Sequence, residues 1–192
     1  MSQARWFDAA AIRVLDVLLA ASLLVVLAAP MVLIALAIRL GDGGPALFCQ
    51  QRVGRRQEPF NVFKFRTMRV ATQAAAFRTE RGDPRITTLG RFLRPSHCDE
   101  LPQLINVLAG DMSLVGVRPD TPMQRSDYSR HYWRDRHRYA PGITGPAQVA
   151  RGDVTLAERS ALEREWLDRR SLPLYLSILW QTVGKVFARS SN

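Results

Sequence analysis

Asp99 and Glu100 are adjacent carboxylates in a strongly basic part of the chain, and they are the first candidates for chemistry. Arg91 and Arg94 lie just before them, and Arg118 lies after them. Two neighbouring acids can hold Mg²⁺, which commonly binds through one or two carboxylates plus the phosphates of a substrate. Fixed cations nearby suit phosphoryl transfer, in which positioning and electrostatic stabilisation supply most of the catalysis. The pattern therefore predicts a catalytic, metal-binding pair that acts on a phosphorylated substrate.

The same pair also has a structural interpretation, because Asp often caps a helix and acidic residues suit its first turn. A helix is predicted directly after the pair, since apolar residues recur at helical spacing before a stop at Gly110. Pro102 is tolerated only in the first turn of a helix. Asp99 is therefore expected at or near the N-cap, with Glu100 beside it. On these residues alone, a capping role and a catalytic role both stay open.

The neighbouring elements follow from local patterns. Strand-like stretches at Ala46–Cys49 and Phe60–Phe65 flank a polar turn, and they predict a β-hairpin that carries Lys64 and leads to Arg66. Helices are predicted at Val70–Arg81, Thr87–Leu93 and Leu156–Arg170, and irregular backbone at Arg118–Pro119 and residues 141–146. Lys64 is thus expected on an element separate from the acidic pair.

The C-terminal segment Leu172–Ala188 has an apolar stripe at helical spacing, with Tyr175 and Trp180 beside it. This composition suits an amphipathic helix in the membrane interface. The same stripe suits a helix packed on a protein core. Both interpretations stay open.

A run of 22 residues without a charge extends from Val17 to Ile38. As a helix it would be about 33 Å long, enough to cross a bilayer. A cleaved signal peptide is not expected, because its apolar region is normally only about 7–15 residues long. Pro30 cannot donate to the carbonyl of Val26, so it bends the helix. Arginines flank both ends of the run, which favours the same side of the membrane for both ends. A spanning helix and a re-entrant helix are both open.

The composition favours an anionic partner. At 192 residues the chain is about one domain long, and its 27 Lys and Arg against 17 Asp and Glu give a net charge of +10. A phosphorylated substrate or an anionic membrane fits this charge. Nucleic acid is not expected, because the sequence has no nucleic-acid-binding signature. Cys49 and Cys98 are too few for a cysteine-based zinc site and are expected as free thiols.

Four ordered motifs carry a family resemblance. They are GGPALFCQQRVGRRQEPFNVFKFRTM, DPRITTLGRFLR, DELPQLINVLAGDMSLVGVRPD, and PGITG with AQV. In this order and spacing, from about Arg13 to the C-terminal helix, the sequence resembles the small monotopic bacterial phosphoglycosyl transferases, which are polyprenyl-phosphate sugar-phosphate transferases. The resemblance implies transfer of a sugar phosphate from a UDP-sugar to undecaprenyl phosphate, with Mg²⁺ as cofactor. It places this reaction at the cytoplasmic face of the bacterial inner membrane, as the first membrane step of glycoconjugate assembly.

The resemblance also assigns expected roles to individual residues. Asp99 matches the nucleophile, which would form a phosphosugar-aspartyl intermediate as UMP leaves, with ping-pong kinetics as the signature. Glu100 matches the partner acid that assists with the metal or with protons. Both acids are thus the expected metal ligands. The expected substrate-binding residues are Lys64, Arg94, Arg118 and Arg151, the last being one place away from the family arginine after AQV.

The family organisation implies an α+β fold that is mostly α with a small β-hairpin. Residues 1–40 would form a re-entrant membrane helix broken at Pro30, and residues 41–192 a cytoplasmic-face catalytic domain with interfacial amphipathic helices. A homo-oligomer is compatible with this organisation. The chain departs from the family pattern at Ala29, His97, Cys98 and Pro146. These departures suggest unusual sugar specificity, and they keep open a catalytically altered, membrane-anchored homologue that acts in binding or regulation.

Overall fold

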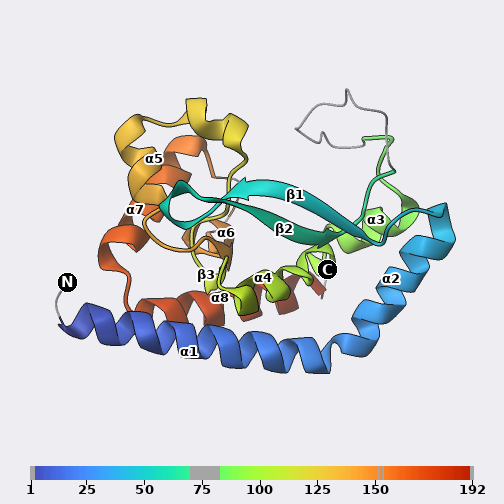
Figure 1. The fold of residues 1–192 in the computed structure, drawn as a ribbon, viewed down its shortest axis with the longest axis horizontal. Helices are drawn as coiled ribbons and strands as arrows, with labels where there is room; N and C mark the ends of the chain where they lie inside the picture. The colour runs from blue at the N-terminus through green and yellow to red at the C-terminus, as the bar shows by residue number, and fades with distance from the viewer. Residues whose placement is uncertain (1–2, 70–82, 151, 153, 191–192) are drawn as a thin grey trace.

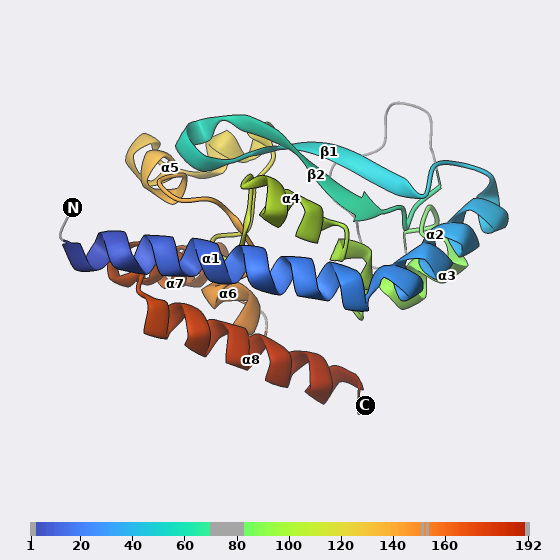
Figure 2. The ribbon, with the colours of Figure 1, turned by 60° about the horizontal axis from the view of Figure 1, so that its bottom comes forward.

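The computed structural model describes residues 3–69, 83–150, 152 and 154–190. These residues form a mostly helical protein with a small antiparallel hairpin and a short parallel strand pair. The hairpin lies on one side, the long helices α1 (Gln3–Val26) and α8 (Leu172–Ser190) lie on the other, and α4 (Gln103–Ala109) lies between them (Figure 1, Figure 2). The predicted mostly α fold with a β-hairpin is confirmed.

Three predicted helices are present close to their expected bounds, as α3 (Thr88–Leu93), α7 (Leu156–Arg169) and α8. The predicted helix Val70–Arg81 lies outside the described residues. Further helical elements are α5 (Arg130–Arg136), α6 (Pro146–Val149) and the 3-10 turns η1 (Arg55–Gln57) and η3 (Pro122–Asp127).

The N-terminal apolar segment is a bent helix. α1 ends at Val26 and α2 (Ala28–Asp42) leaves in a different direction (Figure 1). Hydrogen bonds continue on both sides of the break, from Leu27 to Leu23 and from Met31 to Leu27. Pro30 supplies no N–H to the carbonyl of Val26, which explains why the bend falls here.

The β-hairpin is longer than predicted, with β1 (Leu47–Val53) paired antiparallel to β2 (Pro59–Phe65). Asn106 of α4 ties the hairpin to the helix beneath it. Its side-chain amide donates to the carbonyl of Asn61 (2.7 Å) and accepts from the backbone N–H of Phe63 (3.1 Å). Asn106 is fully buried, so both polar groups are satisfied where water cannot reach them.

A parallel strand pair corrects the prediction of an irregular segment at residues 141–146. β3 (Ser113–Val115) pairs with β4 (Gly142–Thr144). The backbones approach so closely that a Cβ on Gly142 would lie 2.0 Å from the nitrogen of Gly116. Strands of three residues are too short for a periodic pattern, and glycine serves the close approach rather than strand propensity.

Polar side chains of α1 fasten this helix to the rest of the protein. The guanidinium of Arg13 donates to the carbonyls of Val107 (2.6 Å) and Leu108 (2.9 Å) near the C-terminal end of α4. Carbonyls in the last turn of a helix have acceptor capacity left over, and a cation is favourable at that end of the helix dipole.

Asp16, one turn further along α1, is buried and joins three elements. Its Oδ1 accepts hydrogen bonds from the hydroxyl of Ser113 (3.1 Å), the backbone N–H of Leu114 (2.8 Å) and the hydroxyl of Tyr175 (2.7 Å). These partners lie on β3 and α8. One face of α1 is therefore part of the protein core, together with Ile12 and Ala20.

The opposite faces of α1 and α8 are apolar and exposed. Residues Trp6–Val26 are long and apolar enough to cross a membrane by length and composition, with a mean hydropathy of 2.2, and 17% of that stretch is buried in the protein. On α8 the apolar side chains divide between two faces: Tyr175 and Ile178 are buried, whereas Trp180 is 79% exposed. The core-packing interpretation thus holds for one face of α8, and the place of its exposed face in a membrane interface stays a prediction.

Candidate active site

The adjacent carboxylates lie on the 3-10 turn η2 (Cys98–Glu100), and α4 begins only after Pro102. Pro102 is itself the N-cap residue of α4, so the prediction that Asp99 caps this helix is wrong. The reason is that proline has no N–H to bond the carbonyl of Cys98. Leu101 donates to that carbonyl instead (3.3 Å), which winds the chain into the tighter 3-10 geometry.

Glu100 is buried and bound by two cations from distant parts of the chain. Its Oε1 accepts hydrogen bonds from Nζ of Lys64 (2.6 Å) and from the guanidinium of Arg118 (2.7 Å). Burial by itself would raise the pKa of Glu100. The charges and hydrogen bonds of Arg118 and Lys64 outweigh burial and lower that pKa from 4.5 to about 2. Glu100 is therefore an ionised anchor for the two cations across the physiological pH range.

Asp99 has the opposite electrostatic character. Burial and the charge of Glu100 raise the pKa of Asp99 from 3.8 to about 6, against smaller lowering effects of Lys64 and Arg94. Within the described residues, no other side chain donates a hydrogen bond to its carboxylate. Two neighbouring acids with pKa values pushed apart are typical of sites in which the two groups have different tasks.

Arg94 reaches the site from the end of α3. This helix begins after Thr87, whose hydroxyl accepts from the backbone N–H of Gly90 (2.9 Å). Gly90 packs so tightly on the end of the hairpin that a Cβ would lie 2.2 Å from the carbonyl oxygen of Thr67. Since only glycine fits this contact, α3 is fixed against the hairpin, and the charge of Arg94 acts on Asp99.

Lys64 is positioned by the hairpin, which Asn106 holds against α4. Burial lowers the pKa of Lys64, and the nearby charge of Glu100 opposes this effect. Asn106 is a structural residue that the sequence prediction missed. Its signal was a lone amide within the apolar run LINVL of the predicted helix.

Arg52 of β1 is a further cation of the site that the sequence prediction did not assign to it. Its guanidinium donates to the carbonyl of Pro119 (3.1 Å) and to the side chain of Gln50 (2.7 Å). Burial and the charge of Arg118 lower the pKa of Arg52, with Asp120 and Glu100 acting in the opposite direction. The alternation of Gln50 and Arg52 on one strand face was the available signal.

The structure thus brings together Asp99, Glu100, Lys64, Arg94 and Arg118, all of which the sequence predicted. Arg151 lies outside the described residues. Of the departures from the family pattern, His97 and Cys98 adjoin the acidic pair, and His97 is exposed with a left-handed φ of 56°. Pro146 opens α6, and Ala29 lies in α2. Cys49 and Cys98 are free thiols, as expected.

The donor set of the acidic pair fits Mg²⁺ only with help from a substrate. Both cations contact Oε1 of Glu100, which leaves its Oε2 and the oxygens of Asp99 as hard oxygen donors. The described residues contain no cluster of three or more His, Cys, Asp or Glu that could hold a metal alone. Mg²⁺ commonly binds through one or two carboxylates plus substrate phosphates, so the pair fits this mode.

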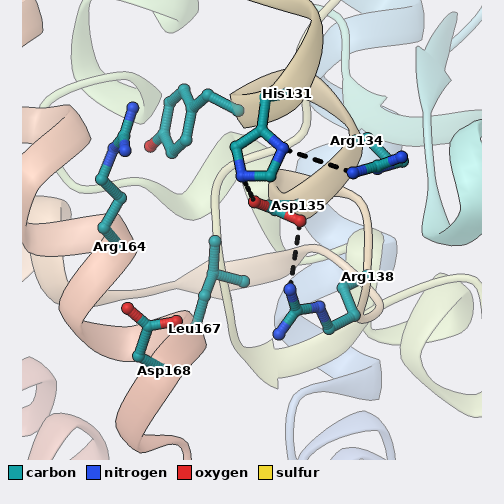
Figure 3. Close-up of a pocket in the computed structure, with 8 residues that line it drawn as sticks. His131, Arg134, Asp135, Arg138, Arg164, Leu167 and Asp168 are labelled. Carbon is teal, nitrogen blue, oxygen red and sulfur yellow. Dashed lines mark hydrogen bonds and ion pairs between the residues drawn. The ribbon is translucent and has the colours of Figure 1, made fainter.

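A separate cavity of about 420 Å³ lies between α5 and α7 (Figure 3). None of the predicted site residues that the structure describes lines it. Asp135 is paired with His131 and Arg138, and Arg164 stacks on the ring of Tyr132. The cavity is not the candidate active site, because the acidic pair and its cations do not line it.

Sequence comparisons find similarity to known bacterial sugar transferases. Residues 7–189 match the family described as bacterial sugar transferase. An undecaprenyl-phosphate glucose phosphotransferase of Komagataeibacter xylinus is 42% identical over 193 residues, covering 93% of this chain and 36% of the relative. A UDP-glucose:undecaprenyl-phosphate glucose-1-phosphate transferase of Caulobacter vibrioides is 44% identical over 181 residues, covering 89% of this chain and 67% of the relative.

A relative with a different sugar in its name is similar over the same region. The UDP-N-acetylgalactosamine-undecaprenyl-phosphate N-acetylgalactosaminephosphotransferase of Aeromonas hydrophila is 38% identical over 168 residues, covering 84% of this chain and 40% of the relative. The chain therefore spans well under half the length of two of these three relatives. Because the family match extends over nearly the whole chain and includes the acidic pair with its cations, the protein belongs to the bacterial sugar transferase family.

Proposed function

We propose that the protein transfers a sugar phosphate from a UDP-sugar to undecaprenyl phosphate, with Asp99 as the nucleophile. The observation that carries the proposal is the unequal environment of two adjacent carboxylates. Glu100 is neutralised by Lys64 and Arg118, whereas Asp99 has a pKa raised to about 6 and a carboxylate that accepts no hydrogen bond from another side chain among the described residues. At neutral pH Asp99 is mostly ionised but partly desolvated, which suits a nucleophile.

The surrounding charges suit a diphosphate substrate. Four cations, Lys64, Arg94, Arg118 and Arg52, act on the two carboxylates or on each other. This leaves an excess of two positive charges. The side chain of Arg118 is 41% exposed although it contacts Glu100, so its planar guanidinium retains donors for a phosphate oxygen.

In the first step, an oxygen of Asp99 attacks the phosphorus that carries the sugar. A bond from this oxygen to phosphorus forms, the anhydride bond to the other phosphate breaks, and UMP leaves with the bonding electrons. Arg118 and Lys64 stabilise the charge that develops on the phosphate oxygens. Mg²⁺ held by Asp99, Glu100 and the diphosphate would neutralise charge on the leaving UMP.

In the second step, an oxygen of the lipid phosphate attacks the same phosphorus. The bond to Asp99 breaks, the carboxylate is regenerated, and the product is polyprenyl-diphospho-sugar. Division of one transfer into two displacements gives ping-pong kinetics. Because each attacking group is already an anion, neither step requires a general base.

The test of the function is UMP release from a panel of UDP-sugars by the protein in vesicles that contain undecaprenyl phosphate and Mg²⁺. UDP-glucose and UDP-N-acetylgalactosamine come first, since the relatives are named for these sugars. We expect Mg²⁺-dependent UMP release with at least one sugar. Continued turnover should require the lipid phosphate, and without it only one burst of UMP should appear. Absence of release with every sugar would favour the alternative, an altered membrane-anchored homologue with a binding or regulatory role.

We also propose that the bent helix α1–α2 enters and leaves the membrane on the cytoplasmic face of the inner membrane. The support is the fastening of α1 to the catalytic part by Arg13 and Asp16. An α1 that crossed the bilayer upright would carry the polar partners of these residues into the hydrocarbon region, which is costly. With the exposed apolar faces of α1 and α8 in the interface, those polar groups stay on the protein side.

Labelling of single cysteines tests this topology. In a chain without Cys49 and Cys98, cysteines at Gln3→Cys and Gly41→Cys mark the two ends of the bent helix. Gly41 has open space for the new side chain. We expect both cysteines to react only with a reagent on the cytoplasmic side. Labelling of the Gln3→Cys variant from the periplasmic side would show a spanning helix.

A further inference from the structure

A buried arginine binds the backbone of Arg118. Arg136 of α5 donates one hydrogen bond to the backbone carbonyl of Arg118 (2.8 Å) and another to Oδ2 of Asp120 (2.7 Å). The side chain of Arg136 is 1% exposed, so it cannot reach a substrate itself. Arg118 contacts Glu100, so Arg136 is connected to the acidic pair through one intervening residue.

Arg136 belongs to a closed set of four charges between the site and α7. It forms an ion pair with Glu163, and Arg159 bonds both Asp120 (3.3 Å) and Glu163 (2.9 Å). Two arginines thus face two carboxylates and the set is neutral. Tyr132 adds a hydrogen bond from its hydroxyl to Glu163 (2.9 Å).

The hairpin also bonds the backbone of the segment from Arg118 to Asp120. The backbone N–H of Val53 donates to the carbonyl of Asp120 (2.9 Å), and Arg52 donates to the carbonyl of Pro119 (3.1 Å). The segment from Arg118 to Asp120 has no helix or strand of its own. Its backbone position therefore depends on these contacts.

A buried ion network is a poor source of net stability, because desolvation of the charges offsets most of their attraction. In this protein the network instead fixes the position of the segment from Arg118 to Asp120. The rigid, planar guanidinium of Arg136 engages the Arg118 carbonyl and the Asp120 carboxylate at once, which a lysine ammonium cannot reproduce. Displacement of a substrate-contacting group by about 1 Å can cost about 100-fold in rate.

We propose that Arg136 is a positioning residue for the transfer reaction, which acts through Asp120 and the Arg118 carbonyl to set the Arg118 guanidinium against Glu100. This inference rests on the proposed function. It separates Arg136 from the residues that contact substrate, and it assigns the buried α5–α7 charges to the geometry of the active site rather than to folding alone.

The test is a double-mutant cycle on kcat/KM for UMP release, with Arg136→Lys, Arg118→Met and the double variant. We expect Arg118→Met to lower kcat/KM about 100-fold and Arg136→Lys to lower it about tenfold. In the Arg118→Met background, Arg136→Lys should change kcat/KM by less than about twofold, because the guanidinium that Arg136 positions is already absent. The amount of UMP in the initial burst gives the fraction of competent protein, so loss of folded protein is counted separately.

Equal effects of Arg136→Lys in both backgrounds would overturn the inference and leave only a structural role. Unchanged kcat/KM in the Arg136→Lys single variant would overturn it as well. If this variant does not fold, Asp120→Asn takes its place, because it keeps the side-chain shape and weakens the same contact. Arg138→Lys is the matched control, since Arg138 is exposed on the cavity between α5 and α7 and pairs with Asp135 rather than with the buried charges (Figure 3). Failure of the wild type to release UMP would instead refute the proposed function.

Discussion

Asp99→Asn is expected to abolish UMP release and the phosphosugar adduct together. An amide is not a competent nucleophile, so turnover should fall by at least about 1,000-fold. The measurement is single-turnover UMP release, with mass spectrometry of the intact protein to detect the adduct. Turnover near the wild-type rate in this variant would remove Asp99 as the nucleophile.

The same variant should be at least as stable as the wild type. The pKa of Asp99 rises from 3.8 to about 6 on folding, so the folded state binds this proton more tightly than the unfolded chain. At pH values above both pKa values, the ionised carboxylate of Asp99 therefore opposes folding. After allowance for solvent screening, removal of its charge should stabilise the protein at pH 7 by on the order of 1 kcal/mol.

Asp168→Asn is the matched control for this pair of measurements. Asp168 is an exposed residue on the cavity between α5 and α7, away from the acidic pair. Neither turnover nor the thermal midpoint should change appreciably. A structural cap at position 99 would give the reverse pattern for Asp99→Ala, with stability lost and activity kept.

Glu100→Gln is expected to lower kcat/KM about 100-fold and to move the acid limb of the pH–rate profile to lower pH. In the wild type this limb should lie near pH 6, because Asp99 must be ionised to attack. The charge of Glu100 raises the pKa of Asp99, whereas Lys64 lowers it. Without the Glu100 charge, the acid limb should shift down by about one pH unit or more.

The stability of the wild type should depend on Glu100 in the opposite pH sense to Asp99. The folded pKa of Glu100 is about 2, against 4.5 for the ordinary side chain. Its contribution is therefore present above pH 4.5 and is lost as the pH falls toward 2. Glu100→Gln should remove this part of the pH dependence, because Lys64 and Arg118 would face a neutral amide.

Two measurements decide this second prediction, namely the acid limb of single-turnover UMP release and urea unfolding between pH 2 and pH 7. Glu165→Gln is the control, since Glu165 pairs with Arg169 on the surface of α7. An acid limb that stays at the same pH in Glu100→Gln would show that the two carboxylates are not coupled, and the division of roles between them would fail.

Local sequence determined the elements of this protein. Pro30 placed the bend between α1 and α2, the charged segment Leu156–Arg170 predicted α7, and the apolar stripe of Leu172–Ala188 predicted α8 nearly to its ends. The hairpin followed from strand-like residues around a polar turn. These features depend on backbone hydrogen bonds and burial within a short stretch of chain, and a local pattern reports both.

The tertiary structure alone decided how the site is assembled. Lys64 and Arg118 lie 36 and 18 residues from Glu100, yet both bond its Oε1. The parallel pair β3–β4 is too short for periodicity to reveal. Asp16 lies next to the uncharged run, but its partners are on β3 and α8. Such contacts depend on packing between distant segments, so no local pattern encodes them.

Asp99 and Glu100 show both contributions. Their residue types and basic surroundings indicated a phosphoryl-transfer pair from the sequence. The 3-10 turn before Pro102, the burial of Glu100 between two cations and the separated pKa values emerged only in three dimensions. Electrostatic environment is a property of the whole neighbourhood, so sequence could identify the two acids but tertiary packing had to give them different roles.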